Sequence, residues 1–202
     1  MQLIGLTGGI AAGKSLVAAR LRELGAVIVD ADVLAREAVA PGSPGLAAVV
    51  EAFGEDVLRA DGSLDRPALG ALVFGHPERL AALNAIVHPE VRRLGTEAIA
   101  RAAAADPAAI VVYDIPLLAE TMATREDSFE RVIVVAAEEA TRIRRMVELR
   151  GMSEAEARAR IAAQASEEDR LRIGTDVIRN DGDVADTLRQ VDAVWEELRR
   201  DR

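Results

Sequence analysis

A glycine-rich segment near the start of the chain has the residues and spacing of a phosphate-binding loop. Residues 8–15 read Gly-Gly-Ile-Ala-Ala-Gly-Lys-Ser, which fits the pattern G-x-x-x-x-G-K-S/T. Lys14 is the only lysine of the chain, and every other basic residue is an arginine. A compact ammonium group fits a ring of backbone N–H groups around a phosphate, whereas a broad guanidinium does not. The segment therefore predicts a site for the phosphates of a nucleoside triphosphate.

Each part of this loop has an expected role toward the nucleotide. The backbone N–H groups and the N-terminus of the following helix attract phosphate. Lys14 is expected to bridge the β- and γ-phosphates, and the hydroxyl of Ser15 to hold Mg²⁺. The predicted nucleotide-binding residues of the loop are Gly8, Gly9, Ile10, Ala11, Ala12, Gly13, Lys14, Ser15 and Leu16.

Two aspartates follow the second apolar run of the sequence. Asp30 and Asp32 are expected at the carboxyl end of a strand, the edge where open α/β sheets bind ligands. If the chain is still extended there, both side chains point to the same side. Asp32 could then accept the proton of an attacking hydroxyl and lie near the metal. The alternative is that Asp32 caps the next helix. Arg36 is either an i,i+4 partner of Asp32 or a contact to substrate phosphate.

Further candidates lie later in the chain. Asp114 ends an apolar run and resembles a Walker-B carboxylate, so Asp30 and Asp114 are both open as metal contacts. Most arginines between residues 139 and 172 are expected on solvated helix faces. Arg145 and Arg150 are the candidates for reaching the transferring phosphoryl group from a mobile lid. Residues 116–118 are expected to form a wall of the substrate site.

Apolar runs alternate with helical patterns and predict an α/β fold. The expected strands are Leu3–Leu6, Ala26–Val29, Ile110–Asp114, Val132–Val135 and a weak one at Asp176–Arg179. Their continuous apolar character predicts a parallel sheet covered on both faces, in a single three-layer domain. The nucleotide-binding core is expected at residues 1–34 and 105–202, a helical insertion at 35–90 and the lid at 139–172. A helix is expected to begin at Pro89, and Ser153 with Glu156 to form a capping box.

Composition excludes several classes of function. A formal charge of −9 over 202 residues argues against nonspecific binding of nucleic acid or of anionic membranes. The absence of cysteine removes disulfides, thiol nucleophiles and Cys-ligated zinc. No leader and no apolar run of about 18 residues is apparent. These features predict a soluble cytoplasmic protein. The expected assembly, which the composition does not specify further, is a monomer or a small homo-oligomer.

Several segments in order along the chain resemble the dephospho-coenzyme A kinase family. They are Leu6–Leu16, Asp30–Arg36, Ile86–Pro89, Pro116–Glu120, Ala159–Gln164 and Asp176–Gly182. The resemblance implies a P-loop kinase with five parallel strands that uses ATP and Mg²⁺ to phosphorylate the ribose 3′-hydroxyl of dephospho-CoA, the last step of CoA biosynthesis. By position, it implies Asp32 as the base and a metal contact with Ser15, and Lys14 and Arg145 as catalytic groups. The other implied contacts are Arg36, His88, Leu117 and Arg150 toward the acceptor, and Asn180 and Gly182 toward the adenine of ATP.

Departures from the family pattern and rival functions complete the sequence hypothesis. Ala11 and Ala12 stand where the family usually has Gly-Ser, which requires only that their backbone angles are acceptable. One rival function is a kinase for another acceptor, such as a nucleoside or a nucleoside monophosphate. The other rival is a nucleotide-binding switch. A GTPase of this kind would carry an N-K-x-D motif, which a chain whose single lysine is Lys14 does not have.

Overall fold

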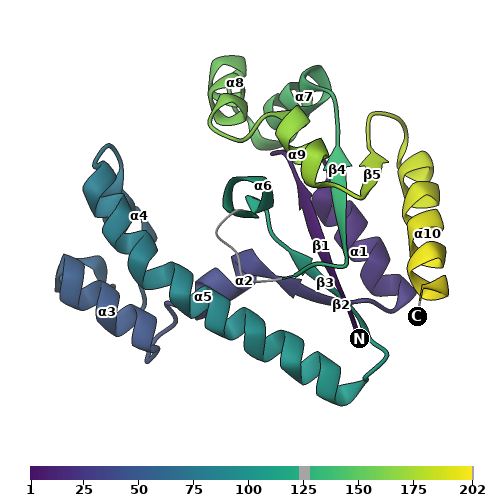
Figure 1. The fold of residues 1–202 in the computed structure, drawn as a ribbon. Coiled ribbons are helices and arrows are strands. Elements are labelled where there is room, and N and C mark those ends of the chain that lie inside the picture. The colour runs from purple at the N-terminus through teal and green to yellow at the C-terminus, as the bar shows by residue number, and fades with distance from the viewer. Residues whose placement is uncertain (123–127, 202) are drawn as a thin grey trace. The chain divides into compact units, whose positions relative to one another are not determined.

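The computed structural model describes residues 1–122 and 128–201, and its centre is a five-stranded sheet (Figure 1). The strands are β1 (Gln2–Gly8), β2 (Val27–Asp30), β3 (Ile110–Asp114), β4 (Arg131–Ala136) and β5 (Asp176–Arg179). Their order in the sheet is β2-β3-β1-β4-β5, and β1 pairs in parallel with both β3 and β4. The predicted α/β fold with a five-stranded parallel sheet is confirmed.

Helices cover both faces of this sheet. Ile4 and Leu6 point to the face that α1 (Lys14–Leu24) and α10 (Val184–Arg200) cover. Because strand side chains alternate between faces, Gly5 points to the opposite face, where Leu118 of α6 (Leu118–Thr121) approaches it. The buried members of the core under α1 and α10 are Ile4, Leu6, Ala12, Val17, Ala18, Leu21, Ala26, Ile110, Val112, Ile133, Val135, Ala137, Ile178, Val191, Trp195 and Leu198. The sheet edge that carries the phosphate loop is therefore fixed by a core on both sides.

The arginine-rich region forms three helices. They are α7 (Glu139–Arg150), α8 (Glu154–Ala162) and α9 (Glu167–Ile173), and α9 packs against β4 on the same face as α6. Gly151 ends α7 in the left-handed region with φ 63°. The predicted capping box is present, because the side chains of Ser153 and Glu156 each bond the other's backbone N–H.

Residues 30–101 form a second compact unit, and residues 1–29 with 102–202 form the first. The second unit contains α2 (Ala31–Glu37), α3 (Pro44–Phe53), η1 (Glu55–Val57), α4 (Arg66–Val73) and most of α5 (Pro77–Ala105). Its own core is built from buried residues of these elements: Val39, Leu46, Val49, Val57, Leu64, Leu69 and Val73. The predicted insertion, residues 35–90, falls within this unit.

The expectation that a helix begins at Pro89 is wrong. Helix α5 runs without interruption from Pro77 to Ala105 and carries Pro89 in its interior. Proline has no N–H and removes one i→i−4 hydrogen bond, but the other turns of a 29-residue helix remain. Ile86 and Val87 pack against the core of the second unit just before the proline, and this packing holds the helix together there.

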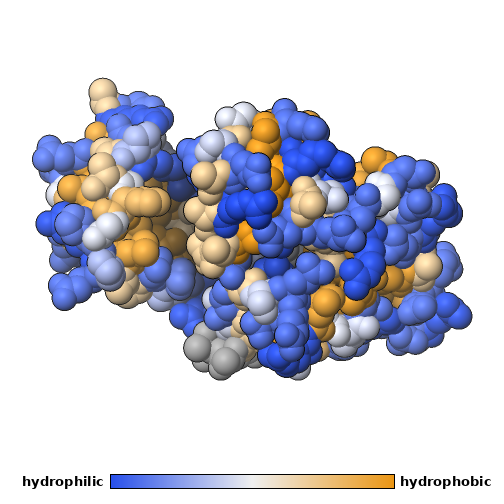
Figure 2. Space-filling view, turned by 90° about the horizontal axis from the view of Figure 1, so that it is seen from above, coloured by the Kyte–Doolittle hydropathy of each residue, from blue (hydrophilic) through white to orange (hydrophobic). Residues whose placement is uncertain are grey.

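The surface agrees with the charged composition. Hydrophilic residues cover much of the face seen in Figure 2, and apolar residues lie between them in patches. Among the residues that the structure describes, no helix is both long and apolar enough to span a membrane.

Candidate active site

The phosphate loop connects β1 to α1, and its shape depends on residues without side chains. Gly13 precedes α1 with φ 97°, a left-handed conformation that glycine adopts readily. A Cβ atom on Gly13 would overlap the side-chain amide of Asn180, and one on Gly8 would lie 2.7 Å from the carbonyl oxygen of Val135. Ala11 also has a positive φ, 61°, which costs a residue with a Cβ about 1–2 kcal/mol. The alanine that replaces the family's glycine is therefore held in a strained conformation.

Lys14 and Asp114 meet at the carboxyl ends of neighbouring strands. Lys14 is the first residue of α1, and Asp114 is the last residue of β3, the strand beside β1. Their side chains form an ion pair and are 17% and 5% exposed, respectively. The parallel register brings them together, because Asp114 pairs with Leu6, just before the loop. The Walker-B-like position proposed for Asp114 thus lies directly beside the loop lysine.

The side chain of Asn180 connects the phosphate loop to α10. The residue is 4% exposed and follows β5 directly. Its Nδ2 donates a hydrogen bond to the carbonyl of Ala12 at 2.8 Å, and its Oδ1 accepts one from Thr187 Oγ1 at 2.9 Å. The side chain predicted to contact adenine therefore ties the loop to the start of α10, and its contact with adenine stays a prediction.

Arg145 binds the same part of the loop. Its Nη2 donates to the carbonyl of Asn180 at 2.8 Å, and its Nη1 approaches the carbonyls of Ala11 and Ala12 at 3.3 and 3.4 Å. The guanidinium is thus engaged with backbone oxygens at the back of the loop. Its predicted contact with the transferring phosphoryl group stays a prediction.

Gln164, which has no assigned role in the sequence hypothesis, also contacts the loop. Its Oε1 accepts a hydrogen bond from the N–H of Ile10 at 2.8 Å. The side chains of Ile10 and Ala11 pack against a small apolar cluster between α7 and α8, centred on Met146. The loop is therefore connected to the arginine-rich helices by polar and apolar contacts together.

The remaining residues predicted in the first unit are accessible. Ser15 is exposed in the first turn of α1, as expected of a hydroxyl that meets a ligand. Leu117 is 47% exposed, although its neighbour Leu118 is buried. Gly182 lines an open hollow between β5 and α10, and Arg150 is exposed in the last turn of α7.

In the second unit, the two aspartates differ in their roles. Asp30 is the N-cap of α2, because its Oδ1 accepts hydrogen bonds from the N–H groups of Asp32 and Val33 at 2.8 and 3.2 Å. The alternative that Asp32 is the cap is therefore wrong. The condition of extended backbone at Asp32 is not met, because Asp32 lies in the first turn of α2. Capping occupies Asp30 and leaves Asp32 exposed.

Arg36 and His88 are also exposed in this unit. Within the part of the chain that the structure describes, no ion pair joins Asp32 to Arg36, and the i,i+4 alternative is not realised.

Comparison with known proteins decides the family. The family model described as dephospho-CoA kinase matches residues 2–186. The chain belongs to the dephospho-CoA kinase family. A dephospho-CoA kinase of Leifsonia xyli subsp. xyli is 54% identical over 98% of this chain and 100% of its own length. One of Streptomyces avermitilis is 55% identical over 98% of this chain and 94% of its own length.

Two solved structures share the fold of this chain. A crystal structure of a Thermus thermophilus protein is 41% identical, with a TM-score of 0.81 over 98% of this chain and 97% of that one. Dephospho-CoA kinase from Campylobacter jejuni is 23% identical with a TM-score of 0.67 over 98% of this chain and 97% of that one, which shows the shared fold.

The residues at the loop suit the magnesium that a dephospho-CoA kinase would use with ATP. Magnesium keeps several waters and takes one or two protein oxygens together with substrate phosphates. The exposed hydroxyl of Ser15, which follows Lys14 in the sequence, and the carboxylate of Asp114, which pairs with Lys14, supply oxygens of this kind. Among the described residues, no group of three or more His, Asp or Glu could hold a metal without a substrate.

Proposed function

We propose that this chain transfers the terminal phosphate of ATP to the ribose 3′-hydroxyl of dephospho-CoA and so completes CoA biosynthesis. The observation that carries the proposal is the phosphate loop with Lys14 paired to a buried carboxylate, in a chain of the dephospho-CoA kinase family.

The first unit binds and orients ATP. The loop N–H groups and the start of α1 bind the phosphates. Asn180 stabilises the strained loop through its hydrogen bond to Ala12, and Arg145 in turn hydrogen-bonds the carbonyl of Asn180. Lys14 is paired with Asp114 and, when a triphosphate binds, shares its charge with the β- and γ-phosphates. Asn180 and Gly182 lie on the α10 side of the loop, where we place the adenine.

Ser15 and Asp114 would hold Mg²⁺, and Asp32 is a further proposed contact to it. When bound, the metal neutralises charge on the β- and γ-phosphates.

The second unit supplies the groups that we assign to the acceptor. Asp32 accepts the proton of the ribose 3′-hydroxyl as the new O–P bond forms, since it is the aspartate of the pair that capping leaves exposed. We assign Arg36 and His88 to the acceptor's anionic groups, and we assign Leu117 and Arg150 as further acceptor contacts.

An acceptor assay tests the proposal. Purified protein is incubated with Mg²⁺-ATP and dephospho-CoA, AMP or adenosine, and ADP release is measured. We expect release with dephospho-CoA alone. Equal release with AMP would favour the rival nucleotide kinase, and no release with any acceptor would favour a switch.

A substitution separates the role of Asp32 from that of the loop. Asp32→Asn keeps the shape and removes the base, so we expect turnover to fall by roughly 10²- to 10⁴-fold while ATP affinity stays within about twofold. Asp56→Asn is the matched control, because Asp56 is also an exposed aspartate of the second unit. Unchanged turnover in Asp32→Asn would refute the assignment of the base.

A further inference from the structure

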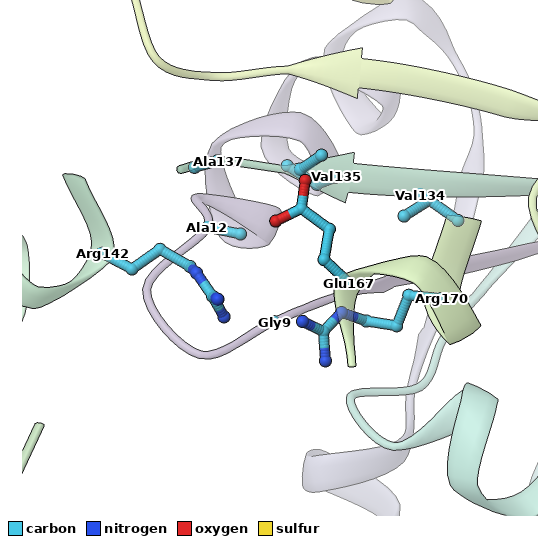
Figure 3. Close-up of a pocket in the computed structure, with 9 residues that line it drawn as sticks. Gly9, Ala12, Val134, Val135, Ala137, Arg142, Glu167 and Arg170 are labelled. Carbon is cyan, nitrogen blue, oxygen red and sulfur yellow. The ribbon is translucent and has the colours of Figure 1, made fainter. Parts of the chain in front are cut away.

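Two buried arginines flank the beginning of the phosphate loop. Arg142 of α7 is 3% exposed and Arg170 of α9 is 4% exposed. Figure 3 shows both guanidinium groups directed toward Gly9 from different helices. A Cβ atom on Gly9 would overlap Nη1 of Arg142 and lie 3.1 Å from Nη2 of Arg170. The loop approaches these two cations closely because glycine stands at this position.

Neither arginine forms an ion pair in the part of the chain that the structure describes. Nε and Nη1 of Arg142 are buried without a hydrogen-bond partner. Arg170 donates through Nη1 to the carbonyl of Ala165, a neutral group. The acid that lines the same pocket, Glu167, directs its carboxylate toward Val135 (Figure 3) and has Oε1 3.9 Å from Arg179.

The rest of the pocket wall around these cations is apolar. Apart from Gly9 and the charged residues named above, the pocket is lined by apolar residues, which are Ala12, Val134, Val135, Ala136 and Ala137. Burial and the neighbouring charge of Arg142 lower the pKa of Arg170, although Glu120, Glu167 and Asp169 act in the opposite direction. A buried and unpaired charge is unfavourable, and a second like charge beside it adds to the cost.

A shortage of acidic residues does not explain the missing partner. The chain has 34 acidic residues against 25 basic ones, and several of its exposed arginines, such as Arg93, Arg158 and Arg172, form ion pairs with carboxylates. Two cations that lie beside a phosphate loop without an ion pair would gain a counter-charge when an anion binds there.

We propose that Arg142 and Arg170 bind the terminal phosphate of the nucleotide and stabilise the charge on it during transfer. This rests on the proposed function, since it requires a nucleoside triphosphate in the loop. The N–H groups at the start of α1 serve the inner phosphates, whereas Gly9 lies at the other end of the loop. The guanidinium of Arg145 approaches three backbone carbonyls, whereas Nε and Nη1 of Arg142 have no hydrogen-bond partner and Arg170 donates to the carbonyl of Ala165. Arg142 and Arg170 therefore have more hydrogen-bonding capacity left for a phosphate than Arg145 has.

The chemical step assigns no proton to these arginines. The bond between the terminal phosphorus and the oxygen bridging to the β-phosphate breaks as the bond to the acceptor oxygen forms. The acceptor proton passes to Asp32, and negative charge spreads over the equatorial phosphoryl oxygens, where arginine is effective. Because Arg142 and Arg170 come from α7 and α9, the phosphate also ties these helices together.

The variant Arg142→Met tests the proposal with two readouts that move in opposite directions. Without nucleotide, we expect a Tm no lower than that of the natural chain, because an unpaired buried charge is replaced by an apolar side chain. We expect the Kd for the β,γ-imido analogue of ATP to rise about tenfold or more, since hydrogen bonds to a charged group are lost, and the Kd for ADP to rise less than threefold. Arg142→Lys, which keeps the charge but loses the fork, should be intermediate.

Arg144→Met is the matched control, because Arg144 is an exposed arginine on the same helix. It should leave all three measurements unchanged. Arg142→Met overturns the proposal if the protein fails to fold, if its Tm falls by several degrees, if both nucleotides weaken equally, or if neither weakens. A natural chain that binds ATP with this pattern but does not phosphorylate dephospho-CoA would refute the proposed function and leave this inference standing.

Discussion

Replacing Asn180 by alanine tests whether the residue acts on the loop or on the adenine. The substitution removes a buried side chain that bonds Ala12 and Thr187. Each neutral hydrogen bond contributes about 0.5–1.5 kcal/mol, so the two together contribute about 1–3 kcal/mol. The groups left behind have weaker alternatives, because Ala12 still faces Arg145 at 3.4 Å and Thr187 Oγ1 still reaches the carbonyl of Asp183 at 3.3 Å. We therefore expect the free energy of unfolding to fall by about 2 kcal/mol.

The effect on nucleotide binding follows from the Ala12 contact alone. If this bond holds the strained loop in its binding shape, its loss of about 1.4 kcal/mol weakens binding about tenfold. The weakening should be the same for ATP, GTP and inorganic tripolyphosphate, because the loop contacts phosphates and not the base. Urea unfolding and isothermal titration calorimetry measure the two quantities.

Thr187→Val is the matched control, since it removes the second hydrogen bond of Asn180 and leaves the one to Ala12. We expect it to lower stability by about 1 kcal/mol and to leave nucleotide affinity within about twofold. A loss of affinity in Asn180→Ala that is confined to ATP, with tripolyphosphate unaffected, would refute the loop argument and assign the residue to adenine.

Two further predictions concern the loop and the helix that follows it. Gly13→Ala should abolish measurable ATP binding, because its Cβ would overlap Asn180 and its backbone φ of 97° disfavours a side chain. Gly62→Ala is the control, because Gly62 has a φ of 76° and open space around it. An equal loss of ATP binding in both variants would contradict the predicted clash at Gly13. The hydrogen bond from Arg20 lowers the pKa of Asp192 below its ordinary value of about 3.9. The pair therefore stabilises the fold at pH values above the ordinary pKa, and this contribution is lost as the pH falls through the lowered pKa. The midpoint of urea unfolding should therefore drop less between pH 7 and pH 3 in Asp192→Asn than in the natural chain. The difference should be small, because the Asp192 side chain is 44% exposed. An equal drop in both proteins would show that this ion pair does not contribute to the pH dependence of stability.

Local patterns predicted the elements of this fold well. The expected strand Ile110–Asp114 has the same bounds in the structure, and the capping box at Ser153 is present. These features depend on neighbouring residues in the sequence, namely apolar runs and a cap with its partner three residues later. The helix through Pro89 was predicted wrongly, because apolar packing on Ile86 and Val87 outweighs the single hydrogen bond that proline removes.

Some features of the candidate site could likewise be predicted from the sequence, and others could not. The spacing of the glycines and Lys14 predicted the loop, since the loop is one continuous segment. The order of Asp30 and Asp32 did not reveal which of them caps α2, because both lie where a helix can begin and capping depends on backbone angles at that point.

The sequence by itself determined the phosphate loop, the alternation of strands and helices, and the resemblance to a kinase family, because each is written in short-range spacing or in ordered motifs. The tertiary structure alone decided that Asp114 pairs with Lys14, that Asn180 and Arg145 hydrogen-bond the loop, and that Arg142 and Arg170 lie beside Gly9. The contacts of Asp114 with Lys14, and of Asn180 and Arg145 with the loop, join residues 100 or more positions apart in the sequence. They depend on strand order and helix packing, which local patterns do not encode.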